Sequence, residues 1–118
     1  MYDFIVVGGS QAGLAMGYHL KQAGYNFLIV DAADEIGSAW LSRWDSLTLF
    51  TPKKYNALPA MAFTGNREYP NKFDVAAYLK SYVKKFDLPI KLNSQVQSVE
   101  KTANIYKLHT STGTLECK

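Results

Sequence analysis

Residues 2–13, with the sequence YDFIVVGGSQAG, join a short apolar run to a glycine-rich turn and lead directly into a helical pattern. Phe4–Val7 is a continuous run of apolar, mostly β-branched residues, which suits a strand buried on both faces of a parallel sheet. The small residues of the turn let the backbone bend sharply and approach a ligand closely. Apolar residues at helical spacing over 12–23 predict a helix whose positive end faces the turn. The segment therefore predicts a pyrophosphate-binding site.

A dinucleotide site also needs a second strand that ends in an acidic residue, because the adenosine ribose requires a hydrogen-bond acceptor there. Gly24 ends the predicted helix, and residues 25–30 have a strand pattern. Asp31 follows, 18 positions after Gly13, where the motif places its acid at about 20. The Asp31 carboxylate would repel a 2′-phosphate, which argues against NADP in this site. FAD and NAD both remain open, because a carboxylate can serve either ribose.

Ser10 stands where the GxGxxG pattern has its middle glycine. We expect its small hydroxyl to donate a hydrogen bond to the pyrophosphate rather than to crowd it. A glycine pattern alone also occurs in ordinary strand-to-helix turns, so the specificity comes from the preceding strand, the following helix and Asp31.

Composition and charge exclude several classes of function. The chain has 118 residues, of which 47% are hydrophobic and 19% charged, as is usual for one globular domain. Its formal charge is +3 with scattered basic residues, so no nucleic-acid partner is expected. His19 and His109 have no metal-ligand partner at useful spacing, which predicts no metal site. Cys117 is the single cysteine, which excludes an internal disulfide and a CxxC motif.

No apolar run approaches the length of a membrane helix, and the predicted first strand leaves no room for a signal sequence. We therefore expect no membrane association and a cytoplasmic location. Residues 51–72 carry three of the four prolines and few regular patterns. This composition predicts a long loop, and such loops are often functional.

The second half of the chain predicts one helix and three short strands. Residues 71–86 have an apolar stripe opposite several lysines, which is typical of an amphipathic helix, and Pro89 marks its end. Alternating segments at 95–100, 104–110 and 114–117 predict an antiparallel β-meander. Together with the first βαβ unit, these segments indicate an α/β fold.

Several motifs after the second strand resemble the flavin-containing monooxygenase superfamily. They are GxxW at 37–40, RWDSLTLFTP at 43–52, LPAMAF at 58–63 and a long match over 69–99. The nearest branch is that of the bacterial flavoprotein oxidoreductases and the plant auxin-forming flavin monooxygenases. The resemblance implies a Rossmann-like FAD/NAD(P)-binding fold with a three-layer ββα arrangement, in which the meander covers one face of the parallel sheet.

The same resemblance implies that the first site binds FAD through ten residues and contains no catalytic side chain. They are Gly8, Ser10, Gln11, Ala12 and Gly13 around the pyrophosphate, Asp31 at the adenosine ribose with Ala32 beside it, Trp40 and Arg43 toward the flavin, and Val96 at the adenine. An aromatic ring can cover an apolar cofactor face, and a guanidinium can bind phosphate or flavin oxygens. The residues alone leave open that Trp40 is a core residue and Arg43 a surface charge.

Members of the resembled superfamily are longer, with a further strand that completes the FAD site and a second glycine motif for NADPH. Residues 1–118 contain neither, so the resemblance implies an incomplete FAD-binding domain, with 40–72 as a loop near the cofactor. This unit would be the N-terminal part of an NAD(P)H-dependent flavoprotein oxidoreductase or monooxygenase, and inactive alone. NADPH and a small-molecule substrate, a soft nucleophile or a ketone, would bind in the longer protein. An unfilled sheet position predicts self-association.

Three alternatives remain open at this point. The chain could be a non-catalytic or vestigial dinucleotide-binding module. A pyridine nucleotide-disulfide oxidoreductase with a cysteine pair close after the first Rossmann unit is disfavoured, because its flavin reduces that pair and Cys117 is alone. Variants that carry their cysteines later in the sequence stay open. An NAD-dependent dehydrogenase fragment would match the first 31 residues but would not explain the motifs at 37–40 and 43–52.

Overall fold

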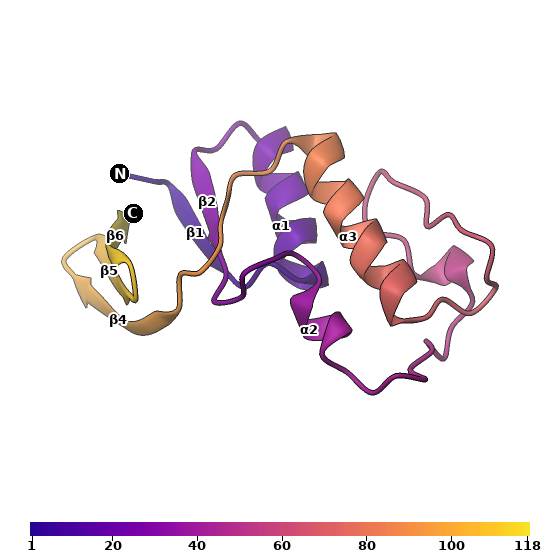
Figure 1. Cartoon of the computed structure of the whole chain (residues 1–118). Coiled ribbons are helices and arrows are strands. Elements are labelled where there is room, and N and C mark those ends of the chain that lie inside the picture. The colour runs from indigo at the N-terminus through magenta and orange to yellow at the C-terminus, as the bar shows by residue number, and fades with distance from the viewer.

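A parallel sheet of three strands forms the centre of the computed structural model, which describes all residues 1–118 (Figure 1). Strand β1 (Phe4–Val7) pairs with β2 (Phe27–Val30), and β2 pairs with β3 (Ile90–Lys91). Helix α1 (Gln11–Gln22) connects β1 to β2, and α3 (Lys72–Phe86) precedes β3. The predicted βαβ unit at the start of the chain is therefore confirmed.

A second, antiparallel sheet contains β4 (Val96–Thr102), β5 (Ile105–Thr110) and β6 (Gly113–Cys117) in that order. Figure 1 shows this meander on the side of the parallel sheet that faces away from α1 and α3. The layers are thus meander, parallel sheet and helices. This arrangement confirms the predicted α/β fold with three ββα layers.

The hydrophobic core lies between the parallel sheet and the two long helices. Its eleven buried residues are Leu14, Leu20, Phe27, Ile29, Ile36, Phe63, Val75, Tyr78, Leu79, Tyr82 and Leu88. Burying each large apolar side chain contributes about 1.5–3 kcal/mol, so this cluster provides the main stabilisation of the helical layer.

Local signals in the sequence explain the ends of α3. Asn71 caps the helix and forms a capping box with Asp74, in which each side chain accepts a hydrogen bond from the other's backbone N–H. Asp87 ends the helix in the left-handed conformation, with φ 48°. The helix therefore ends at Phe86, three residues before Pro89, as predicted.

Strand β1 is less buried than its sequence predicts. Phe4 is 43% exposed and Val7 is 59% exposed. The physical reason is that β1 is an edge strand with a partner on one side only. The bridge to the meander, between Tyr2 and Cys117, lies before β1 begins. A continuous apolar run indicates a strand, but burial depends on the neighbours that the strand finds.

Most of the segment from 42 to 71 is irregular, as predicted for 51–72. Its only helical turn is η1 (Lys53–Tyr55), and isolated bridges join Thr48 to Asn71 and Leu58 to Met61. The sequence did not predict η1, α2 (Ser38–Leu41) or β3, because elements of two to four residues carry no periodic pattern. None of the helices has the length and apolar character that crossing a membrane requires.

Candidate cofactor site

The glycine turn joins the end of β1 to the start of α1. Gly8 has a φ of 106°, which suits glycine far better than any other residue. A Cβ atom on Gly13 would lie 1.8 Å from the Gly8 carbonyl oxygen, so the first turn of α1 packs directly on the backbone that precedes it. Only glycine at position 13 allows this close packing.

The N-terminus of α1 has no side-chain cap. Ser10 is the N-cap residue, but its hydroxyl donates to Gln11 Oε1 at 2.5 Å instead of accepting a bond from the helix backbone. The first turn contains no acidic residue. The free N–H groups and the positive end of the helix dipole therefore remain available to an anion.

A polar pocket of about 320 Å³ lies over this helix end. Its lining residues are Val7, Gly8, Ser10, Gln11, Ala12, Gly13, Trp40 and Arg43. All except Val7 are among the ten predicted cofactor-binding residues, and Arg43 is the only charged one. The Arg43 guanidinium carbon lies 5.0 Å from the centre of the Trp40 ring, which fixes a cation beside an aromatic face.

Asp31 contacts the glycine turn from the end of β2. Its Oδ2 accepts a hydrogen bond from the Gly9 N–H at 2.7 Å, and its Oδ1 accepts one from the Ala33 N–H at 2.8 Å. Ala32, the residue between Asp31 and Ala33, is exposed. A carboxylate offers about four acceptor positions, so Asp31 keeps capacity for ribose hydroxyls while it holds the turn. This second, structural role was not predicted.

Val96 lies apart from the polar pocket, at the start of β4. The chain just before it is attached to β2, because the Ser94 N–H donates to the Asp31 carbonyl oxygen at 2.8 Å. The structure thus brings seven of the ten predicted residues into one pocket. Asp31 and Ala32 lie next to the glycine turn. Val96 lies outside the pocket, two residues after Ser94. The adenine-binding role of Val96 stays a prediction.

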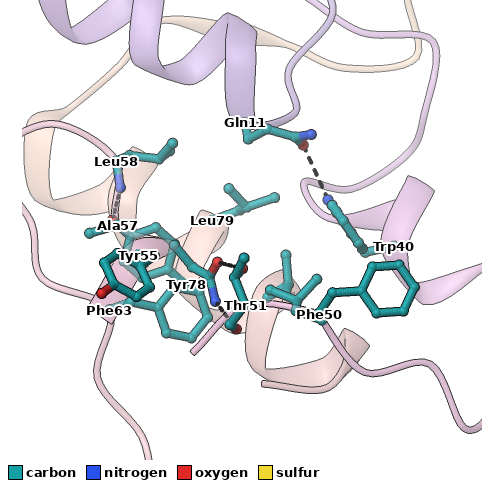
Figure 2. Close-up of a pocket in the computed structure, with 13 residues that line it drawn as sticks. Gln11, Trp40, Phe50, Thr51, Tyr55, Ala57, Leu58, Phe63, Tyr78 and Leu79 are labelled. Atoms are coloured by element: carbon teal, nitrogen blue, oxygen red, sulfur yellow. Dashed lines mark hydrogen bonds between the residues drawn. The ribbon is translucent and has the colours of Figure 1, made fainter. Parts of the chain in front are cut away.

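A second, apolar cavity of about 470 Å³ adjoins the polar pocket and has Gln11 and Trp40 in its lining (Figure 2). These two residues line both hollows, and the Trp40 Nε1–H donates to Gln11 Oε1 at 3.3 Å. Ten of its thirteen lining residues are hydrophobic. The sequence predicted a functional loop in this part of the chain but gave no sign of the cavity, which needs α3 as its wall.

Tyrosines of α3 attach the irregular loop to the helix. The Tyr78 hydroxyl donates to the Met61 carbonyl at 2.6 Å and accepts from the Leu58 N–H at 2.8 Å. The Tyr82 hydroxyl donates to the Pro59 carbonyl at 2.8 Å. Burial raises the pKa of Tyr82 to about 12 and also raises the pKa of Tyr78.

Lys72 is a buried cation that sequence reasoning missed. Its side chain is 6% exposed, and Nζ donates to the carbonyl oxygens of Leu41 at 3.2 Å and Arg43 at 2.7 Å, with the Asp45 carboxylate 3.6 Å away. Lys72 therefore fixes the segment that carries Trp40 and Arg43 to α3. One feature of the sequence could have identified Lys72: it lies at the start of a predicted helix, where the helix dipole disfavours a cation that has no other partner.

Comparison with known proteins places this geometry in a family. Residues 5–118 match the family model described as pyridine nucleotide-disulphide oxidoreductase. The chain belongs to this family. Cys117, the one cysteine among residues 1–118, is a free thiol buried at the end of β6.

Relatives of this family member are flavin monooxygenases and flavoprotein oxidoreductases. Over 112 residues the chain is 46% identical to the uncharacterised oxidoreductase CzcO of Bacillus subtilis (strain 168), covering 94% of this chain and 32% of that protein. Over 110 residues it is 37% identical to the probable indole-3-pyruvate monooxygenase YUCCA3 of Arabidopsis thaliana, covering 90% and 25% respectively.

A solved structure agrees with these sequence relatives. The flavin-containing monooxygenase from Stenotrophomonas maltophilia superposes with a TM-score of 0.91 at 32% identity, over 98% of this chain and 35% of that one. The resemblance to the flavin-containing monooxygenase superfamily is confirmed, and the chain spans about a third or less of the length of these relatives.

Proposed function

We propose that this chain binds FAD as the N-terminal cofactor-binding part of an NAD(P)H-dependent flavoprotein monooxygenase or oxidoreductase. The observation that carries the proposal is the uncapped N-terminus of α1, which opens into a pocket whose only charged residue is Arg43. Helix N–H groups and a guanidinium both favour the doubly charged pyrophosphate. The similarity to the flavin-containing monooxygenase from Stenotrophomonas maltophilia supports FAD over NAD as the dinucleotide.

Each residue of the pocket has a distinct part in this proposal. Gly8 and Gly13 leave room for the pyrophosphate, and Ser10 can rotate its hydroxyl from Gln11 to a phosphate oxygen. The Asp31 carboxylate accepts hydrogen bonds from the ribose hydroxyls at the acceptor positions that the Gly9 and Ala33 N–H groups do not occupy. Trp40 covers the cofactor toward its flavin end, with Arg43 beside it as a counter-charge.

FAD would supply the redox chemistry, while the protein positions it and limits its access to water. We place the NADPH site outside residues 1–118, because these contain only one glycine-rich strand-to-helix turn. The monooxygenase activity and its small-molecule substrate therefore belong to a longer protein that contains this unit. We expect no NADPH-dependent turnover from residues 1–118 alone.

The test is flavin retention by the purified chain. After incubation with FAD and desalting, we expect flavin absorbance with quenched fluorescence in the protein fraction. Asp31→Ala should weaken FAD binding about tenfold or more, through loss of an acceptor for charge-assisted hydrogen bonds. Asp34→Ala is the matched control, because Asp34 is an exposed carboxylate of the same loop.

A chain that circular dichroism shows to be folded, and that retains no FAD, would contradict the proposal. Calorimetric binding of NAD⁺ by such a chain would favour the dehydrogenase alternative instead. Because Asp31 also holds the Gly9 N–H, thermal melting of Asp31→Ala separates lost binding from lost folding.

We also propose that residues 1–118 self-associate through the free edge of β1. Phe4 and Gly8 donate toward β2, so the alternating pattern of a parallel strand directs the backbone groups of Ile5 and Val7 to the open side. Sedimentation at increasing concentration should show dimers, and Phe4→Lys should reduce them. A chain that stays monomeric at high concentration would contradict this interface.

A further inference from the structure

We propose that Ser94 is a positioning residue for the adenosine end of the bound dinucleotide, because its hydroxyl fixes the Asp31 segment to the antiparallel sheet. The inference rests on the proposed function in one respect: the Asp31 carboxylate is the acceptor for the ribose hydroxyls. The link runs through residues 93–95, the connector between β3 and β4.

The connector is bonded to the backbone that carries the Asp31 carboxylate. The Ser94 N–H donates to the Asp31 carbonyl oxygen at 2.8 Å. The Asn93 N–H donates to the Ala33 carbonyl oxygen at 2.9 Å, and the Asp31 N–H donates to Lys91, at the end of β3, at 3.0 Å. Both backbone polar groups of Asp31 are therefore bonded to the chain that leads into the connector, so the position of its carboxylate follows the position of that chain.

The same connector is also bonded to the turn between β5 and β6. The Gln95 N–H donates to the Ser111 hydroxyl oxygen at 3.0 Å, and the Ser111 N–H donates to the Gln95 carbonyl oxygen at 2.9 Å. The connector thus joins the Asp31 segment to the antiparallel sheet by hydrogen bonds to both.

The Ser94 hydroxyl links these two attachments inside the protein. Ser94 is 1% exposed, and its hydroxyl donates to the Leu92 carbonyl oxygen at 3.2 Å. Its single proton is then used, so it accepts from the Thr112 hydroxyl, 2.9 Å away. The Thr110 hydroxyl donates to the Gly113 carbonyl oxygen at 2.7 Å and accepts from the Thr112 N–H at 3.2 Å, which fixes the turn. Ser94 and Thr112 therefore form the hydrogen bond in which a side chain of the connector meets a side chain of the turn.

The strand pairing that follows the connector does not fix it alone. The register of β4 against β5 shifts between Val96 and Ser98, as at a β-bulge. Only the pair of Val96 and Thr110 precedes this shift. One ladder position and the bonds of the connector therefore set where the chain enters the antiparallel sheet. The same bonds place Val96, the predicted adenine contact, relative to Asp31.

The experiment measures ADP binding by calorimetry, because ADP carries the adenosine and diphosphate groups without the flavin. Thr112→Val keeps the shape of an exposed side chain and removes the donor to Ser94. It should weaken ADP binding about threefold to tenfold, as expected for one hydrogen bond, and leave the affinity for inorganic pyrophosphate unchanged. Ser94→Ala should have the same effect, and combining the two should add no further loss. Because Thr112 is exposed, Thr112→Val decides the matter even if Ser94→Ala does not fold.

Two controls separate positioning from a general loosening of the sheet. Thr112→Ser retains the hydroxyl and should bind ADP like the parent chain. Leu108→Val shortens a buried side chain of β5 and leaves the hydroxyls in place, so it should lower the melting temperature but not the ADP affinity. In the ligand-free chain, Thr112→Val should also speed amide exchange at Ser94, whose N–H bonds to Asp31, whereas Thr112→Ser should not.

The proposal is overturned if Thr112→Val leaves ADP affinity unchanged, if Thr112→Ser or Leu108→Val weakens it as much, or if pyrophosphate binding falls in parallel. FAD retention by the parent chain together with such a result would leave the FAD proposal standing. ADP binding that depends on the Thr112 hydroxyl, in a chain that retains no FAD, would support the role of Ser94 and sink the FAD proposal. A folded parent chain that binds neither ADP nor FAD would overturn both.

Discussion

The glycine turn and the loop after α2 both border the polar pocket and the apolar cavity, but different interactions fix the conformations of the two segments. The turn is fixed mainly by backbone packing between near neighbours, Gly13 against Gly8, with one longer-range hydrogen bond from the Gly9 N–H to Asp31. The loop is fixed by side chains of α3, with Lys72 bonded to Leu41 across 31 positions and Tyr82 bonded to Pro59 across 23. The pyrophosphate unit is thus encoded locally, whereas the apolar cavity exists only where a distant helix holds its wall.

The largest effect is expected from Gly13→Ala in the locally encoded region. The added Cβ would meet the Gly8 carbonyl oxygen at 1.8 Å, so α1 must move away from β1. We expect a loss of about 3 kcal/mol or more in the free energy of unfolding, measured by urea denaturation. Gly24→Ala is the control: a Cβ there meets no atom within 4 Å, so it should cost only the left-handed strain of about 1 kcal/mol. Equal losses in the two variants would show that the close contact does not matter.

Alkaline pH should weaken the region held by α3. The pKa of Tyr82 is raised from 10.0 to about 12 by burial, so the unfolded chain loses this proton first as pH rises. The corresponding stability, about 2–3 kcal/mol, is fully present below pH 10 and is lost as pH rises through 12. Urea midpoints measured between pH 8 and 12 test this, and Tyr82→Phe should flatten the profile. A profile that is as steep in Tyr82→Phe as in the parent chain would refute the assignment, and Tyr25→Phe, at an exposed tyrosine, is the control.

Lys72→Met tests the attachment of the Trp40 segment to α3. The substitution keeps the volume of the side chain but leaves the carbonyl oxygens of Leu41 and Arg43 without their donor. We expect a loss of about 2 kcal/mol and a changed tryptophan emission spectrum. Lys80→Met on the same helix removes only the half-exposed ion pair with Glu35 and should cost less than about 1 kcal/mol. Similar losses in both lysine variants would argue against a special role for the buried cation.

Tyr78→Phe should have the smallest effect, because its ring stays stacked on Phe63 while two hydrogen bonds to the loop are lost. We expect a loss of about 1 kcal/mol together with faster amide exchange at Leu58. Unchanged exchange at Leu58 would show that the loop is held by other contacts. This result would weaken the conclusion that side chains of α3 fix the loop.

The sequence predicted the elements whose signals are local. Its periodicity located α1, α3 and the meander to within a few residues, and the capping residues Asn71 and Asp87 mark the ends of α3. The glycine turn and the acid at position 31 were found by spacing alone. The burial of β1 was predicted wrongly, since an apolar run does not reveal whether a strand has neighbours on both sides.

The sequence by itself determined the parallel start of the fold and the turn at the α1 N-terminus, because steric exclusion at Gly13 and apolar periodicity act between residues close in the chain. Only the tertiary structure decided that Asp31 also holds Gly9, that Lys72 is buried, and that an apolar cavity adjoins the cofactor pocket. These features depend on hydrogen bonds and packing between segments far apart in sequence. Such contacts have no spacing rule, since the path of the intervening chain decides which groups meet.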